Sequence, residues 1–207
     1  MPEKVVIVLD GGFAKKVLPK ALGKKGLPTA DEIAKYCDDI MAKPQLAGTR
    51  LLRIYFYDAP PFQGKATNPI SGAVTDYSTT VFGRANQALL ETLELKPNFA
   101  VRRGGLLMGG WKLGRRALRA LPKKKGQITA QDLEPDIRQK GVDLRIGLDI
   151  ATIALKRIAD VIVLVTGDSD LVPAMKFARK EGLRVYLDLV GFLGARQEMK
   201  VHADILL

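Results

Sequence analysis

Two runs of apolar residues lead into aspartates, and these aspartates are the side chains best placed to do chemistry. Residues 5–9 run into Asp10, and residues 161–165 are followed by a Thr-Gly-Asp-Ser-Asp segment that contains Asp168 and Asp170. Continuous apolar runs of this length predict strands buried on both faces of a parallel sheet. In such sheets the first strand usually lies beside a later one where the strand order reverses, and ligands bind beyond the carboxyl ends there. We therefore expect the three carboxylates to meet at one edge of the sheet.

Clustered carboxylates predict a bound cation, because they repel one another and are costly to desolvate unless a positive charge compensates. Their oxygens are hard ligands that suit Mg²⁺ or Mn²⁺. An ion held in this way beside a phosphodiester can polarise it, generate hydroxide and stabilise the leaving oxygen. The single cysteine, Cys37, and the single histidine, His202, exclude a disulfide within the chain, a cysteine-rich zinc site and any mechanism that needs two histidines. Cys37 is expected to be a buried structural thiol.

Each aspartate also has a simpler interpretation. An aspartate after a strand often forms a turn or caps the next helix, so Asp168 or Ser169 could serve only as a cap. Thr166 and Ser169 could orient phosphate or water, or could be turn residues. The joint presence of Asp10 and the Gly-Asp-Ser-Asp segment, each after an all-apolar run, favours the metal site.

A fourth acid is expected from the helix predicted over residues 141–158. This helix must begin at the same edge of the sheet, because it runs antiparallel to the strand that follows it. Asp143 lies in its first turn, whereas Asp149 is about 9 Å further along the axis, at ~1.5 Å per residue, and about 240° around it. This geometry ranks Asp143 above Asp149, which could instead form a salt bridge. Asp58 ends another predicted strand and is a peripheral candidate of lower rank.

Strands and helices alternate along the chain, which predicts one three-layer α/β domain over residues 1–207. Its Rossmann-like sheet is expected to be mostly parallel, with five to six strands flanked by helices. Residues 104–139 are predicted to form an irregular basic excursion of the same domain. Strands are predicted at 5–9, 50–57, 99–103, 161–165, 183–189 and 203–207, a loop at 59–79, and helices near 13 and at 30–41, 80–95, 141–158, 170–180 and 194–201.

The net charge of +11, from 33 basic and 22 acidic residues, favours polyanionic partners. Nucleic acid and an anionic membrane surface both meet this description, and a basic surface that serves only solubility is the alternative. The chain has no apolar run of 18 residues and no signal-peptide pattern, so we expect a cytoplasmic protein that does not enter a membrane. No dinucleotide fingerprint or P-loop is present, which disfavours a nucleotide cofactor.

Basic pairs and aromatic residues are candidates for contacts with nucleic acid. Arg102 and Arg103 are favoured because they end a predicted strand at the expected site. The other basic groups are Lys15–Lys16, Lys24–Lys25, Arg115–Arg116 and Lys123–Lys125. The aromatic candidates, which could instead only pack, are Phe62, Tyr77, Phe82 and Trp111.

Several segments together resemble the NYN family, whose domains are similar to PIN nucleases. The most specific is the stretch at residues 165–173, which contains the Gly-Asp-Ser-Asp sequence, and it is supported by residues 8–13, 57–61, 101–104 and 140–143 and by Asp149. The resemblance implies a PIN-like fold and a ribonuclease that depends on Mg²⁺ or Mn²⁺. It implies Asp10, Asp143, Asp168 and Asp170 as metal ligands and catalytic residues. Many members carry an Asn shortly after the first Asp, whereas here Gly-Gly-Phe-Ala follows Asp10.

The function predicted from these features is metal-dependent hydrolysis of RNA. The alternative is an RNA-binding regulatory module with a weakened or inactive nuclease site, and a second alternative is a metal-dependent phosphatase or DNA nuclease on a related fold. The oligomeric state is left open, because residues 205–207 could pair with another chain or complete the sheet. The residues expected to contact substrate are Lys15, Lys16, Arg102, Arg103, Thr166 and Ser169.

Overall fold

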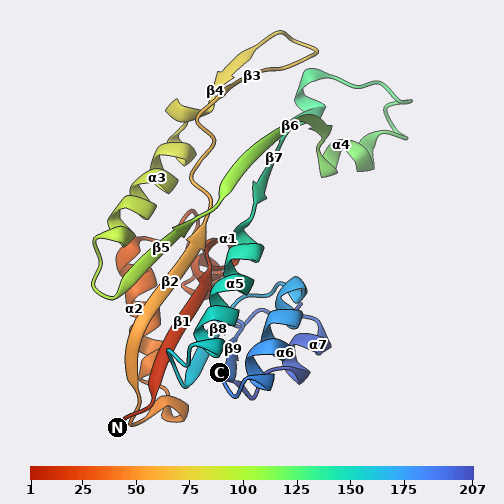
Figure 1. Cartoon of the computed structure of the whole chain (residues 1–207). Helices are drawn as coiled ribbons and strands as arrows, with labels where there is room; N and C mark the ends of the chain where they lie inside the picture. The colour runs from red at the N-terminus through yellow and green to blue at the C-terminus, as the bar shows by residue number, and fades with distance from the viewer.

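A six-stranded sheet with the strand order β10-β9-β8-β1-β2-β5 forms the centre of the molecule (Figure 1). The computed structural model describes residues 1–207. Every pair of neighbouring strands in this sheet is parallel. The strands are β1 (Lys4–Asp10), β2 (Arg50–Asp58), β5 (Phe99–Arg103), β8 (Val161–Val165), β9 (Arg184–Asp188) and β10 (Ile205–Leu206).

The strand order reverses between β1 and β8. From β1 the chain moves outward through β2 to β5, and it then returns to β8 on the other side of β1. The register pairs Val5 with Val161 and Leu9 with Val165, so the two strands end side by side. The predicted α/β class, with helices flanking a parallel sheet, is confirmed. The reversal at β1 and β8 is where a ligand site is expected in such folds.

Helices cover both faces of the sheet because successive residues of each buried strand point to opposite sides. In β1, Val5, Ile7 and Leu9 pack with the layer of α1, α2 and α3, whereas Val6 and Val8 pack with the layer of α5, α6 and α7. The helices are α1 (Gly11–Ala21), α2 (Ala30–Met41), α3 (Val81–Glu94), α5 (Val142–Leu155), α6 (Val172–Lys180) and α7 (Gln197–Val201).

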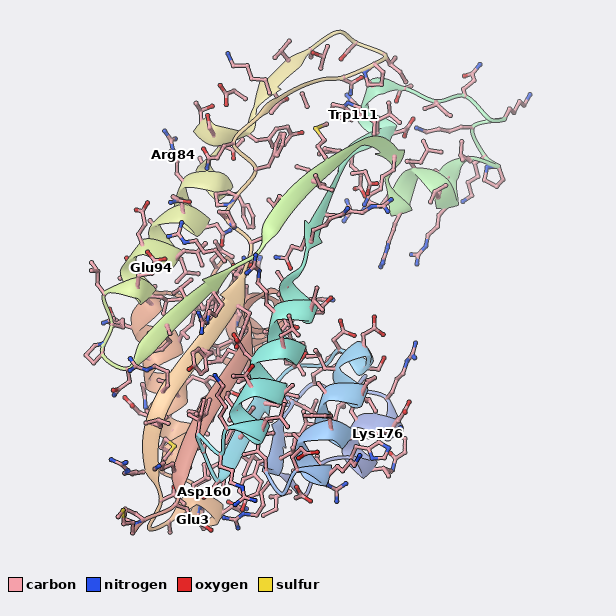
Figure 2. All side chains as sticks on the ribbon, in the orientation of Figure 1. Glu3, Arg84, Glu94, Trp111, Asp160 and Lys176 are labelled. Atoms are coloured by element: carbon pink, nitrogen blue, oxygen red, sulfur yellow. The ribbon has the colours of Figure 1, made fainter.

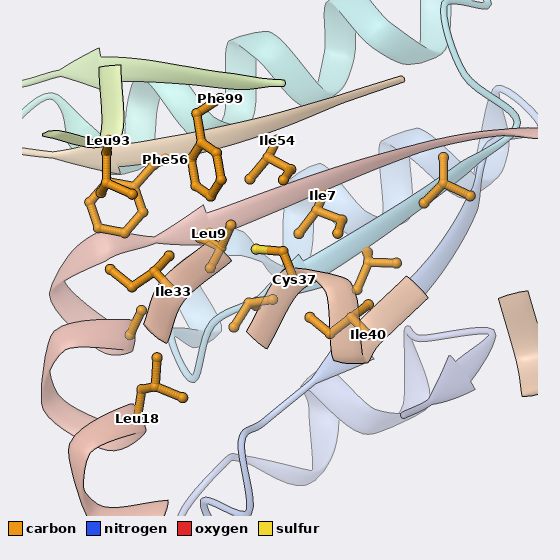
Figure 3. Packing of buried hydrophobic residues seen from close by; sticks show 14 of the residues in the cluster. Ile7, Leu9, Leu18, Ile33, Cys37, Ile40, Ile54, Phe56, Leu93 and Phe99 are labelled. Carbon is orange, nitrogen blue, oxygen red and sulfur yellow. The ribbon is translucent and has the colours of Figure 1, made fainter. Parts of the chain in front are cut away.

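The first of these two cores is shown from close by in Figure 3. Ile33, Cys37 and Ile40 of α2 lie against the sheet, and each is fully buried. Burial raises the pKa of the Cys37 thiol, so this side chain behaves as a buried structural group, as predicted. Helix α2 begins with a capping box, in which the side chains of Thr29 and Glu32 each accept a hydrogen bond from the backbone N–H of the other residue.

One predicted helix is corrected. The segment predicted to be one helix from residue 170 starts with a 3-10 turn, η4 (Ser169–Leu171), before α6. In α5, the side chains of Leu144, Leu148 and Leu155 face solvent, whereas the buried face carries residues such as Ile146. The chain has no helix that combines the length and the apolar character needed to cross a membrane.

Residues 104–139, predicted to be irregular, instead form an ordered arm. Strand β6 (Gly105–Leu113) pairs antiparallel with β7 (Leu133–Lys140), and the tip between them carries α4 (Arg115–Ala120) and the 3-10 turn η3 (Ala130–Asp132). The register shifts between Met108 and Trp111, where Gly110 adopts a φ of 99°. Such a bulge needs a residue that tolerates positive φ, and Gly110 supplies it within the strand.

The arm extends from the carboxyl edge of the sheet (Figure 1). Strand β6 follows directly after β5, and β7 leads directly into α5. A second hairpin lies within the predicted loop at 59–79 and consists of β3 (Lys65–Thr67) and β4 (Val74–Asp76), followed by the 3-10 turn η2 (Tyr77–Thr79). Figure 2 shows Trp111 on the arm, whereas Glu3 and Asp160 lie at the opposite end of the sheet. Both hairpins therefore project on the side where the predicted site lies.

Candidate active site

Asp10 is the last residue of β1 and the N-cap of α1. Its Oδ1 atom accepts a hydrogen bond from the backbone N–H of Phe13 at 3.1 Å, and its Oδ2 atom accepts one from Thr166 Oγ1 at 3.0 Å. Burial raises the pKa of Asp10, and the negative charges of Asp143 and Asp168 raise it further, while the two hydrogen bonds act in the opposite direction. Asp10 is therefore held in one orientation within a region of excess negative charge.

The residues after Asp10 explain why the Asn found in many NYN domains is absent. A Cβ atom at position 11 would lie 2.7 Å from the backbone oxygen of Tyr57 and 2.9 Å from Cβ of Asp58, so only Gly11 allows α1 to start this close to β2. Two positions on, the ring of Phe13 packs edge to face against Phe192, with 5.7 Å between the ring centroids. Packing therefore occupies both positions at which a polar residue would be expected.

Asp168 follows β8 and caps the turn η4. Its Oδ1 atom accepts a hydrogen bond from the backbone N–H of Asp170 at 2.9 Å, and its own N–H donates to Thr166 Oγ1 at 3.1 Å. Asp10 and Asp168 are therefore both N-caps, which is the simpler of the two interpretations that the sequence allowed. The capping bond uses only Oδ1 of Asp168 and leaves its Oδ2 atom without a hydrogen bond. Asp168 can therefore cap the turn and bind a metal ion at the same time.

Asp143 lies in the first turn of α5, at the edge of the sheet where β1 and β8 end. Partial burial raises the pKa of Asp143, and so do the nearby charges of Asp168 and Asp170. The charge of Asp143 also acts on Asp10. The fold thus gathers all four predicted acids from three separate segments of the chain.

No basic side chain neutralises this group. All the ion pairs in the molecule involve other acids. In a chain with 33 lysines and arginines, four neighbouring unpaired aspartates are a notable imbalance. A bound cation would relieve the repulsion between them.

The donor set fits a hard divalent ion that also takes ligands from elsewhere. No three acidic, histidine or cysteine side chains converge closely enough to hold a metal by themselves. Mg²⁺ is commonly held by only one or two carboxylates, with water and substrate phosphate as its other ligands. Carboxylate oxygens suit Mg²⁺ or Mn²⁺ better than softer metals. The four aspartates therefore fit such an ion, but not a closed metal cage.

Asp58, the lower-ranked candidate, is neutralised by a lysine. It is fully buried at the end of β2, where it forms an ion pair with Lys15 and accepts a hydrogen bond from Gln139 Nε2 at 2.9 Å. Lys15 Nζ also donates to Asn86 Oδ1 at 2.9 Å, and the lysine side chain is only 12% exposed. The structure thus corrects the expectation that Lys15 contacts substrate phosphate.

Asp149 belongs to a different group of side chains, on the buried side of α5. It accepts a hydrogen bond from the Tyr57 hydroxyl at 2.8 Å and lies 3.3 Å from Nε of Arg102. The Arg102 guanidinium also lies over the Tyr55 ring, 5.2 Å from its centroid. Asp149 therefore forms a salt bridge, which was the alternative to its being a metal ligand.

Three other residues that were predicted to contact substrate also have partners within the protein. Arg103 forms an ion pair with Glu94 at 2.9 Å, and Arg102 is engaged as described above, so the favoured basic pair is already bound to acids. Thr166 is fully buried, and its hydroxyl serves Asp10 and Asp168 instead of solvent.

An open cavity of about 390 Å³ lies beside the acids and has basic residues in its wall. Asp10 and Asp168 line it together with Lys16, Ser169 and Arg196. Lys16 and Ser169 were predicted, whereas Arg196 was missed. No local sequence motif marks Arg196 as a site residue, because it lies in the segment between β9 and α7 and reaches the cavity only through the tertiary fold.

A parallel sheet covered by helices on both faces, with acids at the carboxyl ends of β1 and β8, defines a protein of the PIN-like α/β class. Residues 113–205 match the family model of the NYN domain, which confirms the resemblance predicted from the sequence motifs. The match includes three of the four acids, Asp143, Asp168 and Asp170. The NYN family is in general a class of nucleases.

Comparison with solved structures gives a fold relationship. The chain is similar to a crystal structure of a protein of unknown function from Vibrio parahaemolyticus RIMD 2210633, with a TM-score of 0.53 and 15% sequence identity. The alignment covers 100% of this chain and 92% of the other. A comparison with curated proteins found no match. At this identity the likeness extends to the fold alone.

Proposed function

We propose that the protein is a ribonuclease that hydrolyses RNA phosphodiester bonds with the help of Mg²⁺ or Mn²⁺. The observation that carries the proposal is the group of four neighbouring aspartates, none of them paired with a basic residue, in a chain of net charge +11. The match to the NYN family over residues 113–205 supports the class of reaction.

The four aspartates have separate parts in this proposal. Asp10 and Asp168 would hold the ion, and Asp143 and Asp170 would complete its surroundings. When bound, the ion supplies a water of lowered pKa and stabilises negative charge on the scissile phosphate. Thr166 keeps the carboxylate of Asp10 in orientation, as groups behind metal ligands commonly do.

The basic residues of the cavity bind the RNA backbone. Lys16 and Arg196 line the same cavity as Asp10 and Asp168, so phosphates on either side of the scissile bond can pair with them. The arm adds further positive charge on the same side of the molecule, because Arg115 and Arg116 line a cavity at its tip. A single-stranded or structured RNA could follow this path.

The decisive experiment measures cleavage of a mixed pool of single-stranded and hairpin RNA with Mn²⁺, Mg²⁺ or EDTA. The variant is Asp168→Asn, which keeps the side-chain oxygen that caps η4 but removes the charge. The matched control is Asp39→Asn on α2, because Asp39 is an exposed acid that pairs with Lys35 at 2.9 Å, far from the site. We expect metal-dependent cutting by the wild type and the control, and none by Asp168→Asn. EDTA-insensitive cutting that survives in Asp168→Asn would refute the proposal.

A second function, an RNA-binding module with a weakened or inactive site, has one observation in its favour. No three metal-binding side chains converge in the absence of an ion. RNA retained on a filter in EDTA, with no cleavage under any metal, would support this alternative. DNA and a small phosphomonoester belong in the same assay, because turnover of the phosphomonoester alone would indicate a phosphatase instead.

A further inference from the structure

A third cavity lies beyond the carboxyl end of β2, on the same side of the sheet as the acids. It has a volume of about 340 Å³, which is within the range of small-molecule sites. Three of the four aromatic residues that the sequence singled out, Phe62, Tyr77 and Phe82, line it together. They come from the loop after β2, from η2 and from the start of α3, so only the fold brings them together.

The aromatic side chains give this cavity apolar walls. The rings of Phe62 and Tyr77 meet edge to face, with 5.8 Å between their centroids. Phe82 is the second residue of α3, and 65% of it is exposed. An aromatic ring so exposed beside two others, in a wall that also contains Pro60 and Pro61, offers a surface on which a flat ligand can stack.

One polar group in the cavity wall is a hydrogen-bond donor without a partner. Asn86 is only 4% exposed, and its Oδ1 atom accepts from Lys15 Nζ at 2.9 Å. Because a lysine can only donate, this bond determines which end of the amide is oxygen. The Nδ2 atom of Asn86 therefore points away from Lys15, and it makes no hydrogen bond within the protein. Asn86 lines the cavity, so this amide can donate to a ligand there.

A second polar group in the same wall is an acceptor, and it connects the cavity to the acids. Gln139 donates from Nε2 to Asp58 at 2.9 Å, which leaves its Oε1 atom free to accept. A methyl group placed on Gly12 would lie 3.5 Å from this Oε1 and 3.3 Å from Oδ1 of Asp10. Gly12 therefore separates the cavity acceptor from the first acid, with no side chain between them.

We propose that this cavity binds one unpaired nucleobase of the RNA, stacked on the aromatic residues and hydrogen-bonded through Asn86 and Gln139. Each of the four bases carries both a donor and an acceptor on its Watson–Crick edge, and these groups are accessible only when the base is unpaired. The backbone attached to such a base would pass Gly12 towards Asp10. The proposal rests on the proposed function for its ligand, and it makes single-stranded RNA the substrate class.

The test is a binding measurement in EDTA, by fluorescence anisotropy of a labelled RNA of 10 to 12 nucleotides. Two strands of equal length and charge are compared, one normal and one in which every base has been removed. The variant is Phe82→Ala, since this exposed ring can be removed without opening the core. The matched control is Leu155→Ala, which truncates another exposed apolar side chain, at the far end of α5.

We expect Phe82→Ala to weaken binding of the normal strand by about 5- to 150-fold, the range for loss of one stacked base. Binding of the abasic strand should be equal for wild type and Phe82→Ala, and Leu155→Ala should change neither. Equal weakening on both strands, or no weakening on the normal strand, would overturn the proposal. Because the assay contains no metal, it measures base binding independently of cleavage. Failure of the base-binding proposal can therefore be distinguished from failure of the proposed ribonuclease activity.

Discussion

The hydroxyl of Thr166 donates a hydrogen bond to Oδ2 of Asp10, with 3.0 Å between the two oxygens. This bond joins the end of β8 to the end of β1. The same hydroxyl oxygen accepts a hydrogen bond from the backbone N–H of Asp168. One fully buried side chain thus sets the positions of two acids that lie far apart in the sequence.

Replacing Thr166 by valine should lower activity strongly without removing any acid. Valine has a similar shape but cannot donate to Asp10 or accept from Asp168, so both groups lose their buried partner. Loss of a group that orients a metal ligand commonly costs about 10- to 100-fold in metal affinity or activity. The measurement is the Mn²⁺ dependence of RNA cleavage. Thr166→Ser, which keeps the hydroxyl, should restore most of the activity, and a serine variant as weak as the valine variant would contradict this role.

Asp143→Asn should stabilise the metal-free protein at neutral pH. The folded-state pKa of Asp143 lies above its ordinary value of 3.8 because of burial and the charges of Asp168 and Asp170. The folded protein therefore binds this proton more tightly than the unfolded chain, and the ionised carboxylate destabilises the fold above the folded-state pKa. This penalty disappears as the pH falls through that pKa. The gain in stability from Asn should thus be present at pH 7 and should vanish at acidic pH.

The check is the melting temperature in EDTA across this pH range. Each kcal/mol of relieved repulsion should raise Tm by about 2–4 °C for a chain of this size. Asp39→Asn is the control, because its carboxylate has a favourable lysine partner and should show no gain. A lower Tm for Asp143→Asn than for wild type at pH 7 would show that the helix dipole at the start of α5, which favours the charge, outweighs the repulsion.

Lys15→Met should destabilise the fold severely. The substitution leaves Asp58, which is fully buried, without its positive partner. Removing one member of a buried ion pair costs about 3–5 kcal/mol. Urea unfolding would measure this loss, and the double variant Lys15→Met with Asp58→Asn should recover part of it, since no buried charge remains. Lys35→Met, in an exposed pair, should change stability by less than about 1 kcal/mol. Equal effects of the two lysine variants would contradict the structural role of Lys15.

Lys16→Gln and Arg196→Gln should each weaken the salt dependence of RNA binding. If each side chain contacts one phosphate of a single strand, its loss should reduce the slope of log K against log[salt] by about 0.7. Filter binding at several salt concentrations in EDTA gives the slope. Lys35→Gln, on the exposed face of α2, should leave it unchanged. An unchanged slope for both cavity variants would place the RNA backbone elsewhere.

The sequence alone was sufficient for the central sheet and for the expectation that the four aspartates lie near one another at one edge of it. Strands buried on both faces must be continuously apolar, so residues 5–9 and 161–165 could be recognised by local composition. The chirality and packing of β-α-β units then place the carboxyl ends of such strands together. Helix periodicity alone ranked Asp143 above Asp149, and the structure places Asp143 beside Asp168 and Asp149 beside Arg102.

Only the tertiary structure decided which charged groups are free to act. Lys15 and Arg102 have the same sequence signature as Lys16, but each is paired with an acid from a distant segment. Arg196 and the aromatic cavity depend on loops that fold back over the edge of the sheet. Ion pairs and cavity walls of this kind join segments far apart in the chain, so no local pattern of residues specifies them. They form only once the packed core has brought those segments together.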